Sequence, residues 1–155
     1  MDQVAEAIDP AALRRVIDEL EIRNILARLA HIADTASIDE LDQYLALWTE
    51  DGTWAVLSGT SLPTQEQRGH AELRAAAEAR REAGVQGPGT DSRHIVSTNV
   101  VEFESADRAR ARSYFHVFRD TRGERPVSDS VGEYTDTFVR TPEGWKLQRR
   151  EIVQG

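Results

Sequence analysis

The stretch LAHIADTAS (residues 29–37) decides how the first half of the chain is organised, because a helix is expected to end within it. The residues before it are apolar at helical spacing, whereas Thr35 and Ser37 are typical of a new start. Asp34 therefore falls in the last helical turn. The negative end of the helix dipole disfavours an ionised carboxylate there by up to about 1 kcal/mol. We expect a positively polarised partner to offset the charge of Asp34.

Upstream of this stretch, the sequence predicts two helical segments. Asp9 followed by Pro10 is typical of a helix start, with the aspartate as N-cap and the proline in the first turn. Two apolar stripes follow, rotated by nearly half a turn: Leu13, Val16, Ile17 and Leu20, and then Ile22, Ile25, Leu26, Leu29 and Ala33. One straight helix could not bury both stripes against one surface. We therefore predict a short leading helix, a break near residues 20–22, and a core helix that ends at Asp34.

Downstream of the stretch, helical patterns give way to strands. The capping-box sequence SIDE predicts a second helix over residues 37–48, and an alanine-rich segment predicts a third over residues 69–83. A short strand at 53–57 and polar loops at 58–68 and 84–92 separate them. The remaining sequence predicts four strands: 93–104, 108–119, 131–140 and 145–153. Helices followed by a meander of strands are typical of an α+β fold, with the helices on one face of a curved sheet.

The composition excludes several classes of protein. A chain of 155 residues suits a single domain (1–155), and its 39% hydrophobic and 30% charged residues are typical of an ordinary globular protein. With 27 acidic against 19 basic residues, the net charge of −8 provides no basic surface for nucleic acid or for an anionic membrane. No segment has the pattern of a signal peptide or a membrane span, so we expect a cytoplasmic protein.

The sequence also predicts neither a metal nor a cofactor. The chain contains no cysteine, which excludes disulfides, thiolate nucleophiles and cysteine-ligated metals. Its four histidines are scattered and show none of the usual ligand spacings. A glycine-rich phosphate loop of either standard form is also absent from the sequence.

Several motifs together resemble a known family. They are the helix that ends in an acid, ALWTEDGTW (46–54), RGHAEL (68–73), and the strand segments RHIVSTNVVEFESADRARARSY (93–114) and GEYTDTFVRTPEGWKLQRREI (132–152). These segments resemble the SnoaL-like branch of the nuclear transport factor 2-like superfamily, which is related to scytalone dehydratase, ketosteroid isomerase, bile-acid dehydratase and hexachlorocyclohexane dehydrochlorinase. The resemblance implies a cone-shaped, mostly antiparallel curved sheet that encloses a pocket with about three N-terminal helices.

The resemblance also implies a catalytic pair. In the dehydratase and dehydrochlorinase members, an aspartate at the end of the core helix pairs with a strand histidine, and these roles fall on Asp34 and His94. A carboxylate on one ring nitrogen fixes the tautomer and stabilises the imidazolium, so the other nitrogen can act as a general base. This chemistry suits a cofactor-free lyase or isomerase acting on a small hydrophobic molecule, such as a steroid, polyketide or aromatic catabolite. A non-catalytic binding or accessory protein of the same fold is the alternative.

The position of Arg150 is a second expectation from the resemblance. Alternation from Trp145 and Leu147 would bury Arg149 on their face and leave Arg150 on the other. The family, however, places an anion-binding arginine five residues after the tryptophan, which is Arg150. We favour Arg150, because bulges are common near the ends of curved strands.

Further pocket residues are expected from the same comparison. Many relatives carry a tyrosine or lysine near positions 29 and 30 to polarise the substrate, whereas this chain has Leu29 and Ala30. Another donor must then do this work, and the candidates are Tyr44, Tyr134 and Arg150. Trp54, Tyr134 and Trp48 are expected to line the pocket or to belong to the core.

His116 has two alternative placements. Strand alternation places His116 on the convex face of the sheet with Tyr114 and Phe118, an apolar patch suited to a homodimer contact, with a trimer as the alternative. Scytalone dehydratase has a second active-site histidine in this region, so a bulge could turn His116 into the pocket to bind substrate. His31 lies opposite the buried stripe of its helix and is expected to face solvent.

Overall fold

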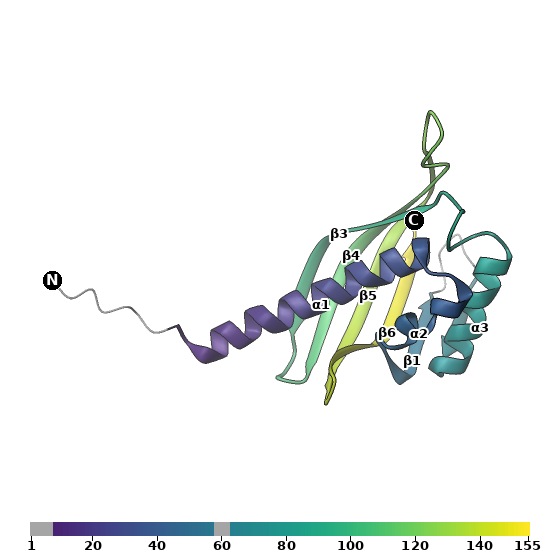
Figure 1. Cartoon of the computed structure of the whole chain (residues 1–155). Helices are drawn as coiled ribbons and strands as arrows, with labels where there is room; N and C mark the ends of the chain where they lie inside the picture. Colours follow the sequence, from purple (N-terminus) through teal and green to yellow (C-terminus); the bar gives the residue numbers. More distant parts are fainter. Residues whose placement is uncertain (1–7, 58–62) are drawn as a thin grey trace.

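The computed structural model describes residues 8–57 and 63–155. Six strands form one sheet in the order β2-β1-β6-β5-β4-β3, in which β1 and β6 are parallel and every other neighbouring pair is antiparallel. Figure 1 shows this arrangement. The elements in chain order are α1 (Pro10–Thr35), a 3-10 turn (Ile38–Glu40), α2 (Asp42–Leu45), β1 (Trp48–Val56), β2 (Gln65–Arg68), α3 (Gly69–Glu82), β3 (Arg93–Phe103), β4 (Arg108–Arg119), β5 (Val127–Thr141) and β6 (Gly144–Gln154).

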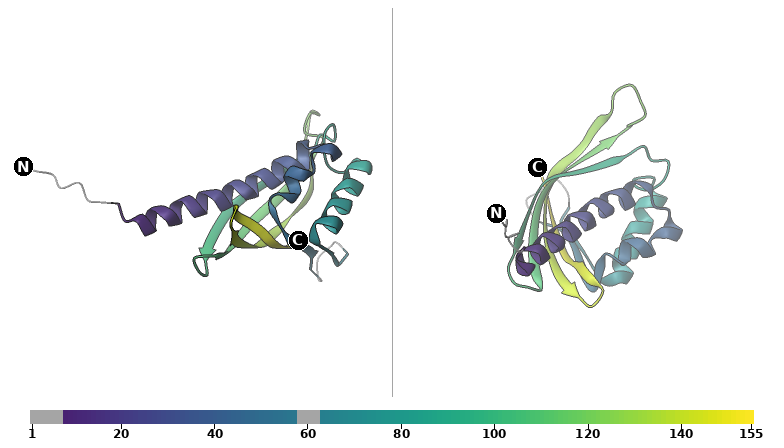
Figure 2. Two further views of the ribbon diagram at one scale, coloured as in Figure 1. Left: turned by 60° about the horizontal axis from the view of Figure 1, so that its bottom comes forward. Right: turned by 60° about the vertical axis from the view of Figure 1, so that its left-hand side comes forward.

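The helices gather on one face of a curved, open sheet (Figure 2). α1 packs on β3 and β6, while α3 packs on β1 and β2. The predicted α+β fold, with three helices and a mostly antiparallel curved sheet, is confirmed. The core lies between the two layers, and its most deeply buried large side chains are Ile22, Leu26, Trp48, Leu73, Phe138 and Leu147. Each such side chain contributes about 1.5–3 kcal/mol through burial.

Helix α1 is one uninterrupted helix, so the predicted break near residues 20–22 is wrong. The prediction assumed that both apolar stripes are buried within this chain. Only the second stripe is buried, whereas Val16 and Leu20 of the first remain 55% and 62% exposed. The first turns of α1 extend beyond the edge of the sheet in Figure 1. Since no surface formed by the described residues covers the first stripe, no change of helix direction is needed.

The second predicted helix is also wrong in its extent. Only Asp42–Leu45 is α-helical, after a 3-10 turn, and Trp48 already begins β1. The backbone N–H of Leu147 donates to the carbonyl of Leu47 at 2.9 Å, so pairing with β6 replaces the last helical turn. Part of the predicted polar loop 58–68 is the edge strand β2, and residues 58–62 lie outside the described residues.

An ion pair joins the N-terminal half of α1 to the hairpin between β5 and β6. Asp18 is buried and accepts two hydrogen bonds from Arg140, at 3.0 Å and 2.6 Å. The hydrogen bonds from Arg140 lower the pKa of the Asp18 carboxyl from its ordinary value, against the opposing effect of burial. The pair therefore stabilises the folded chain when Asp18 is ionised.

We expect Asp18→Asn to lower the free energy of unfolding by about 1.5–3 kcal/mol at neutral pH, because the charge and one of the two oxygens that accept from Arg140 are lost. Since the pKa of Asp18 is lower in the folded chain, its contribution is present above a pH of about 4 and is lost as the pH falls through the folded value. Urea unfolding at neutral pH and at about pH 3 should show the difference shrinking. The exposed Glu19–Arg23 pair provides the control, since Glu19→Gln should change stability by less than about 1 kcal/mol.

Candidate active site

A cavity of about 460 Å³ opens between the helices and the concave face of the sheet. Its volume is in the range of ordinary small-molecule sites. Apolar and aromatic residues make up most of its wall, and the polar and charged residues that complete it come from different elements. The expected residues Tyr44, Trp48, Trp54, His94, Tyr134 and Arg150 all line it.

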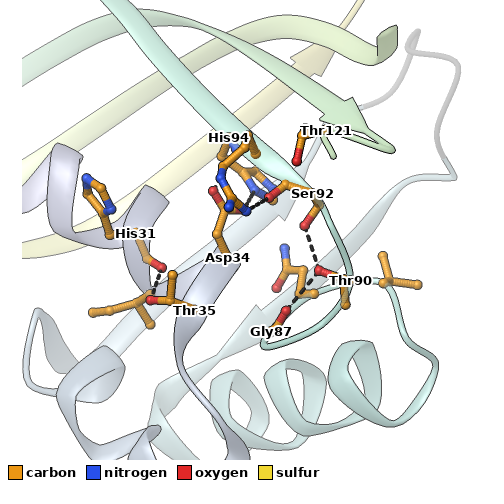
Figure 3. Close-up of polar contacts among 12 residues, drawn as sticks. His31, Asp34, Thr35, Gly87, Thr90, Ser92, His94 and Thr121 are labelled. Atoms are coloured by element: carbon orange, nitrogen blue, oxygen red, sulfur yellow. Dashed lines mark hydrogen bonds and ion pairs between the residues drawn. The ribbon is translucent and has the colours of Figure 1, made fainter. Parts of the chain in front are cut away.

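Asp34 and His94 are in direct contact at the wall of this cavity. Oδ1 of Asp34 lies 2.6 Å from Nδ1 of the His94 ring, and Oδ2 accepts a hydrogen bond from the His94 backbone N–H at 2.9 Å. Figure 3 shows the two side chains meeting where α1 ends and β3 begins. Both side chains are largely buried, with 6% and 11% exposed. Because a carboxylate only accepts, Nδ1 carries the shared proton and Nε2 is the ring nitrogen left to react.

The end of α1 that carries Asp34 is held by groups that satisfy its carbonyls. Arg81 of α3 donates to the carbonyls of Ile32 at 2.9 Å and Ala36 at 2.7 Å. The backbone N–H of Gly87 donates to the carbonyl of Ala33 at 2.8 Å. The guanidinium of Arg81 therefore offsets the negative end of the helix dipole, and His94 partners the carboxylate of Asp34. Sequence reasoning did not identify Arg81.

Arg150 faces the cavity because β6 contains a bulge. Thr137 pairs with Arg149 while Phe138 pairs with Leu147, so Gln148 is the extra residue and the alternation shifts by one. Arg150 makes two hydrogen bonds to Asp136, at 2.8 Å and 2.7 Å. Burial alone would lower the pKa of Arg150, but the carboxylate of Asp136 raises it above its ordinary value.

Asp136 is a second residue that sequence reasoning missed. It is fully buried and lies on β5 in the inward set with Tyr134 and Phe138. A buried carboxylate needs a cationic partner, so the acid at an inward position of this strand could have indicated the pair from the sequence. The bidentate pair neutralises Arg150, so the expected role of this arginine in binding an anion or polarising a substrate meets competition from Asp136.

Two tyrosines contribute hydroxyl groups to the cavity. Burial raises the pKa of Tyr134 to about 12 and also raises the pKa of Tyr44. Both hydroxyls therefore stay protonated at neutral pH and can donate hydrogen bonds. The ring of Tyr134 is fixed between the stacked ring of Phe115, at 4.5 Å between centroids, and the guanidinium of Arg150, at 4.0 Å.

Arg80 is a third residue that the sequence did not single out. It precedes Arg81 on α3 and lines the cavity, where its guanidinium carbon lies 5.4 Å from the ring centroid of Trp54. Its Nε donates to Oε1 of Gln86 at 3.2 Å. Burial lowers the pKa of Arg80 below its ordinary value, although an arginine stays protonated.

His116 does not line the cavity, so of its two alternative placements the structure favours the convex face. The bulge between β4 and β5 places its extra residue, Asp129, on β5, so the alternation of β4 continues and His116 is not turned inward. Its Nε2 lies 2.7 Å from the Ser128 hydroxyl, and its ring stacks on Phe118 at 4.0 Å. Neighbouring apolar residues of the convex face are exposed, including Tyr114 at 54%. A homodimer through this face stays a prediction.

Two other properties concern the described residues as a whole. No group of three or more His, Asp or Glu side chains gathers within residues 8–57 and 63–155 in a way that could hold a metal ion. None of the helices in this part of the chain combines the length and the apolar character that crossing a bilayer requires. His31 is exposed, as expected.

The fold and its cavity place the chain in the nuclear transport factor 2-like class of α+β proteins. Residues 14–151 match the SnoaL-like domain, and the chain belongs to this family. A nuclear transport factor 2-like protein with a cystatin-like fold from Novosphingobium aromaticivorans is 29% identical, with a TM-score of 0.77 over 96% of this chain and 92% of that chain.

More distant solved structures share the fold. A scytalone dehydratase-like protein from the same organism is 23% identical, with a TM-score of 0.66 over 91% of this chain and 86% of that chain. A protein assigned as the β subunit of an aromatic-ring-hydroxylating dioxygenase, also from Novosphingobium aromaticivorans, is 18% identical, with a TM-score of 0.70 over 92% and 91%. A search of curated proteins found no match. At these identities the likeness concerns the fold.

Proposed function

We propose that this protein is a cofactor-free lyase or isomerase that moves a proton on a small hydrophobic molecule, with His94 as general base and Asp34 as its partner. The observation that carries the proposal is the 2.6 Å contact between Asp34 and Nδ1 of His94 at the wall of an apolar cavity. Nuclear transport factor 2-like proteins include dehydratases and isomerases, which use this kind of chemistry.

The geometry supports a defined proton path. Nε2 of His94 takes a proton from a carbon next to a carbonyl or leaving group, and the electron pair of the C–H bond moves toward that group. The imidazolium that forms keeps its hydrogen bond to Asp34, whose negative charge stabilises it. The same Nε2–H then returns the proton to another carbon, in isomerisation, or to the departing group, in elimination.

The negative charge that develops on the substrate oxygen needs a hydrogen-bond donor. Leu29 and Ala30 cannot supply one from their side chains, so the donor must come from another position. Tyr134 and Tyr44 are proposed for this role, since both line the cavity with protonated hydroxyls. Arg150 is the weaker candidate because Asp136 already occupies two of its N–H groups. Trp54 and Phe115 contribute apolar wall against which a flat substrate can pack.

The proposal can be tested without the natural substrate. 2-Tetralone is an apolar bicyclic ketone whose protons next to the carbonyl exchange with deuterium when a base removes them. The wild-type protein should accelerate this exchange in D₂O, measured by NMR, in proportion to protein concentration. An exchange rate that does not change on adding the protein would contradict the proposal for ketones of this size.

We expect Asp34→Asn to lower the protein-dependent exchange rate by roughly 10-fold, less than the loss of the base itself. The amide still contacts the ring but carries no charge to stabilise the imidazolium. The exchange assay checks this, with circular dichroism to show that the fold is intact. Exchange by Asp34→Asn at the wild-type rate would show that the carboxylate has no part in proton transfer.

A non-catalytic binding or accessory protein is the second candidate. It is favoured by the pairing of Arg150 with Asp136 and by the absence of a donor at positions 29 and 30. In that case the cavity binds a ligand, His94 and Asp34 only join α1 to β3, and no variant of the pair changes an exchange rate.

A further inference from the structure

Four arginines line the cavity, and three of them are already bound to carboxylates or backbone carbonyls of this chain. Arg150 is paired with Asp136, Arg119 has Asp129 at 3.5 Å, and Arg81 donates to three backbone carbonyls. Arg80 differs, because no carboxylate lies within ion-pair distance of it in the part of the chain that the structure describes. A largely desolvated guanidinium without a counter-charge is costly, so this position points to an anion supplied from outside the chain.

The geometry of the Arg80 guanidinium also suits ligand binding. One of its five N–H groups is used by Gln86, at 3.2 Å, which fixes the orientation of the guanidinium. Its contact with Trp54 holds the guanidinium beside an aromatic wall of the cavity. The two terminal nitrogens have no acceptor among residues 8–57 and 63–155. They present the parallel N–H pair that a carboxylate accepts in bidentate form.

We propose that the cavity binds an apolar, ring-containing molecule that carries one carboxylate, and that Arg80 receives this carboxylate. The apolar wall, with Leu29, Trp54 and Phe115, takes the hydrocarbon body. A single charge fits the site, because one unbalanced guanidinium can neutralise a carboxylate but would leave the second charge of a phosphate monoester unpaired. A phenolate or enolate oxygen fits less well, since it accepts at one atom where Arg80 offers two N–H groups.

This assignment names the substrate class of the proposed reaction and rests on the cavity being its site, but its test measures binding alone. 2-Naphthoate and its neutral near-isostere 2-naphthamide are titrated into the full-length protein at neutral pH by calorimetry. The wild type should bind the carboxylate about 10- to 100-fold more tightly than the amide. Arg80→Gln should remove that preference and leave amide binding unchanged, while Arg80→Lys should keep part of it.

A control variant completes the experiment. Arg149→Gln removes the same charge from the outer side of the sheet, where Arg149 pairs with Glu66 and Glu151, and should keep the carboxylate preference. The titration involves no proton transfer, so failure of 2-tetralone exchange and loss of anion binding are separate results. The proposal is overturned if the wild type binds both probes equally or binds neither. It is also overturned if Arg80→Gln keeps the preference.

Discussion

Replacing His94 with alanine is expected to lower the protein-dependent rate of 2-tetralone exchange by about 10²- to 10⁴-fold, the usual contribution of a positioned general base. The variant loses Nε2, the nitrogen that Asp34 leaves available by binding Nδ1 at 2.6 Å. The cavity itself is retained, so binding of apolar ligands should change far less than the exchange rate. Exchange followed by NMR at saturating 2-tetralone separates the two effects.

His31 supplies a matched control for this variant. It lies on α1 three residues before Asp34, but it is exposed and does not line the cavity. His31→Ala should therefore exchange 2-tetralone at the wild-type rate. If His94→Ala and His31→Ala were equally active and both folded, the histidine of β3 would have no role as a base, and the binding-protein alternative would be preferred.

Asp136→Ala is expected to lower the free energy of unfolding by about 3–5 kcal/mol, because it leaves the buried guanidinium of Arg150 without a counter-charge. The carboxylate of Asp136 is fully buried and makes two hydrogen bonds to Arg150, so both its charge and its acceptors are lost. Urea unfolding of the variant and of the wild type measures the difference. A loss near 3 kcal/mol or more would be large against the total stability of an ordinary domain.

A double variant distinguishes loss of the pair from loss of packing. Asp136→Ala combined with Arg150→Met removes both charges, and much of the stability lost in the single variant should return. If the double variant were no more stable than the single one, the cost would come from the space that Asp136 fills. A single variant with less than about 1 kcal/mol of destabilisation would show that water in the cavity hydrates Arg150.

Local patterns in the sequence predicted most elements of the fold, and contacts between distant segments account for the errors. The four C-terminal strands are confirmed, although β5 begins at Val127, four residues before the predicted start. β2 was missed because Gln65–Arg68 is a polar edge strand with no apolar alternation. The break in α1 was wrong because an apolar stripe in a sequence does not show whether the chain itself will cover it.

The sequence predicted the acid–base pair of the candidate site but not the surroundings of its arginines. The contact between Asp34 and His94 is present where the helix end and the family resemblance placed it, and its role in catalysis stays a proposal. Arg150 faces inward only through the bulge at Gln148, which no alternation reveals. Arg80 could not be distinguished from the other exposed-looking arginines of an alanine-rich helix, because its significance depends on which carboxylates are absent around it.

The two consecutive arginines of α3 give the cavity a property that neither has alone. Arg80 lines the cavity, while Arg81 donates hydrogen bonds to the carbonyls of Ile32 and Ala36, on either side of Asp34. Because Arg80 and Arg81 are neighbours on one helix, we expect a ligand that restrains Arg80 to restrain the support of the aspartate as well. Occupancy and the ordering of the acid–base pair are then thermodynamically linked, and linkage is reciprocal. Whatever factor a bound ligand adds to the population of the ordered pair, the ordered pair adds to the affinity for that ligand.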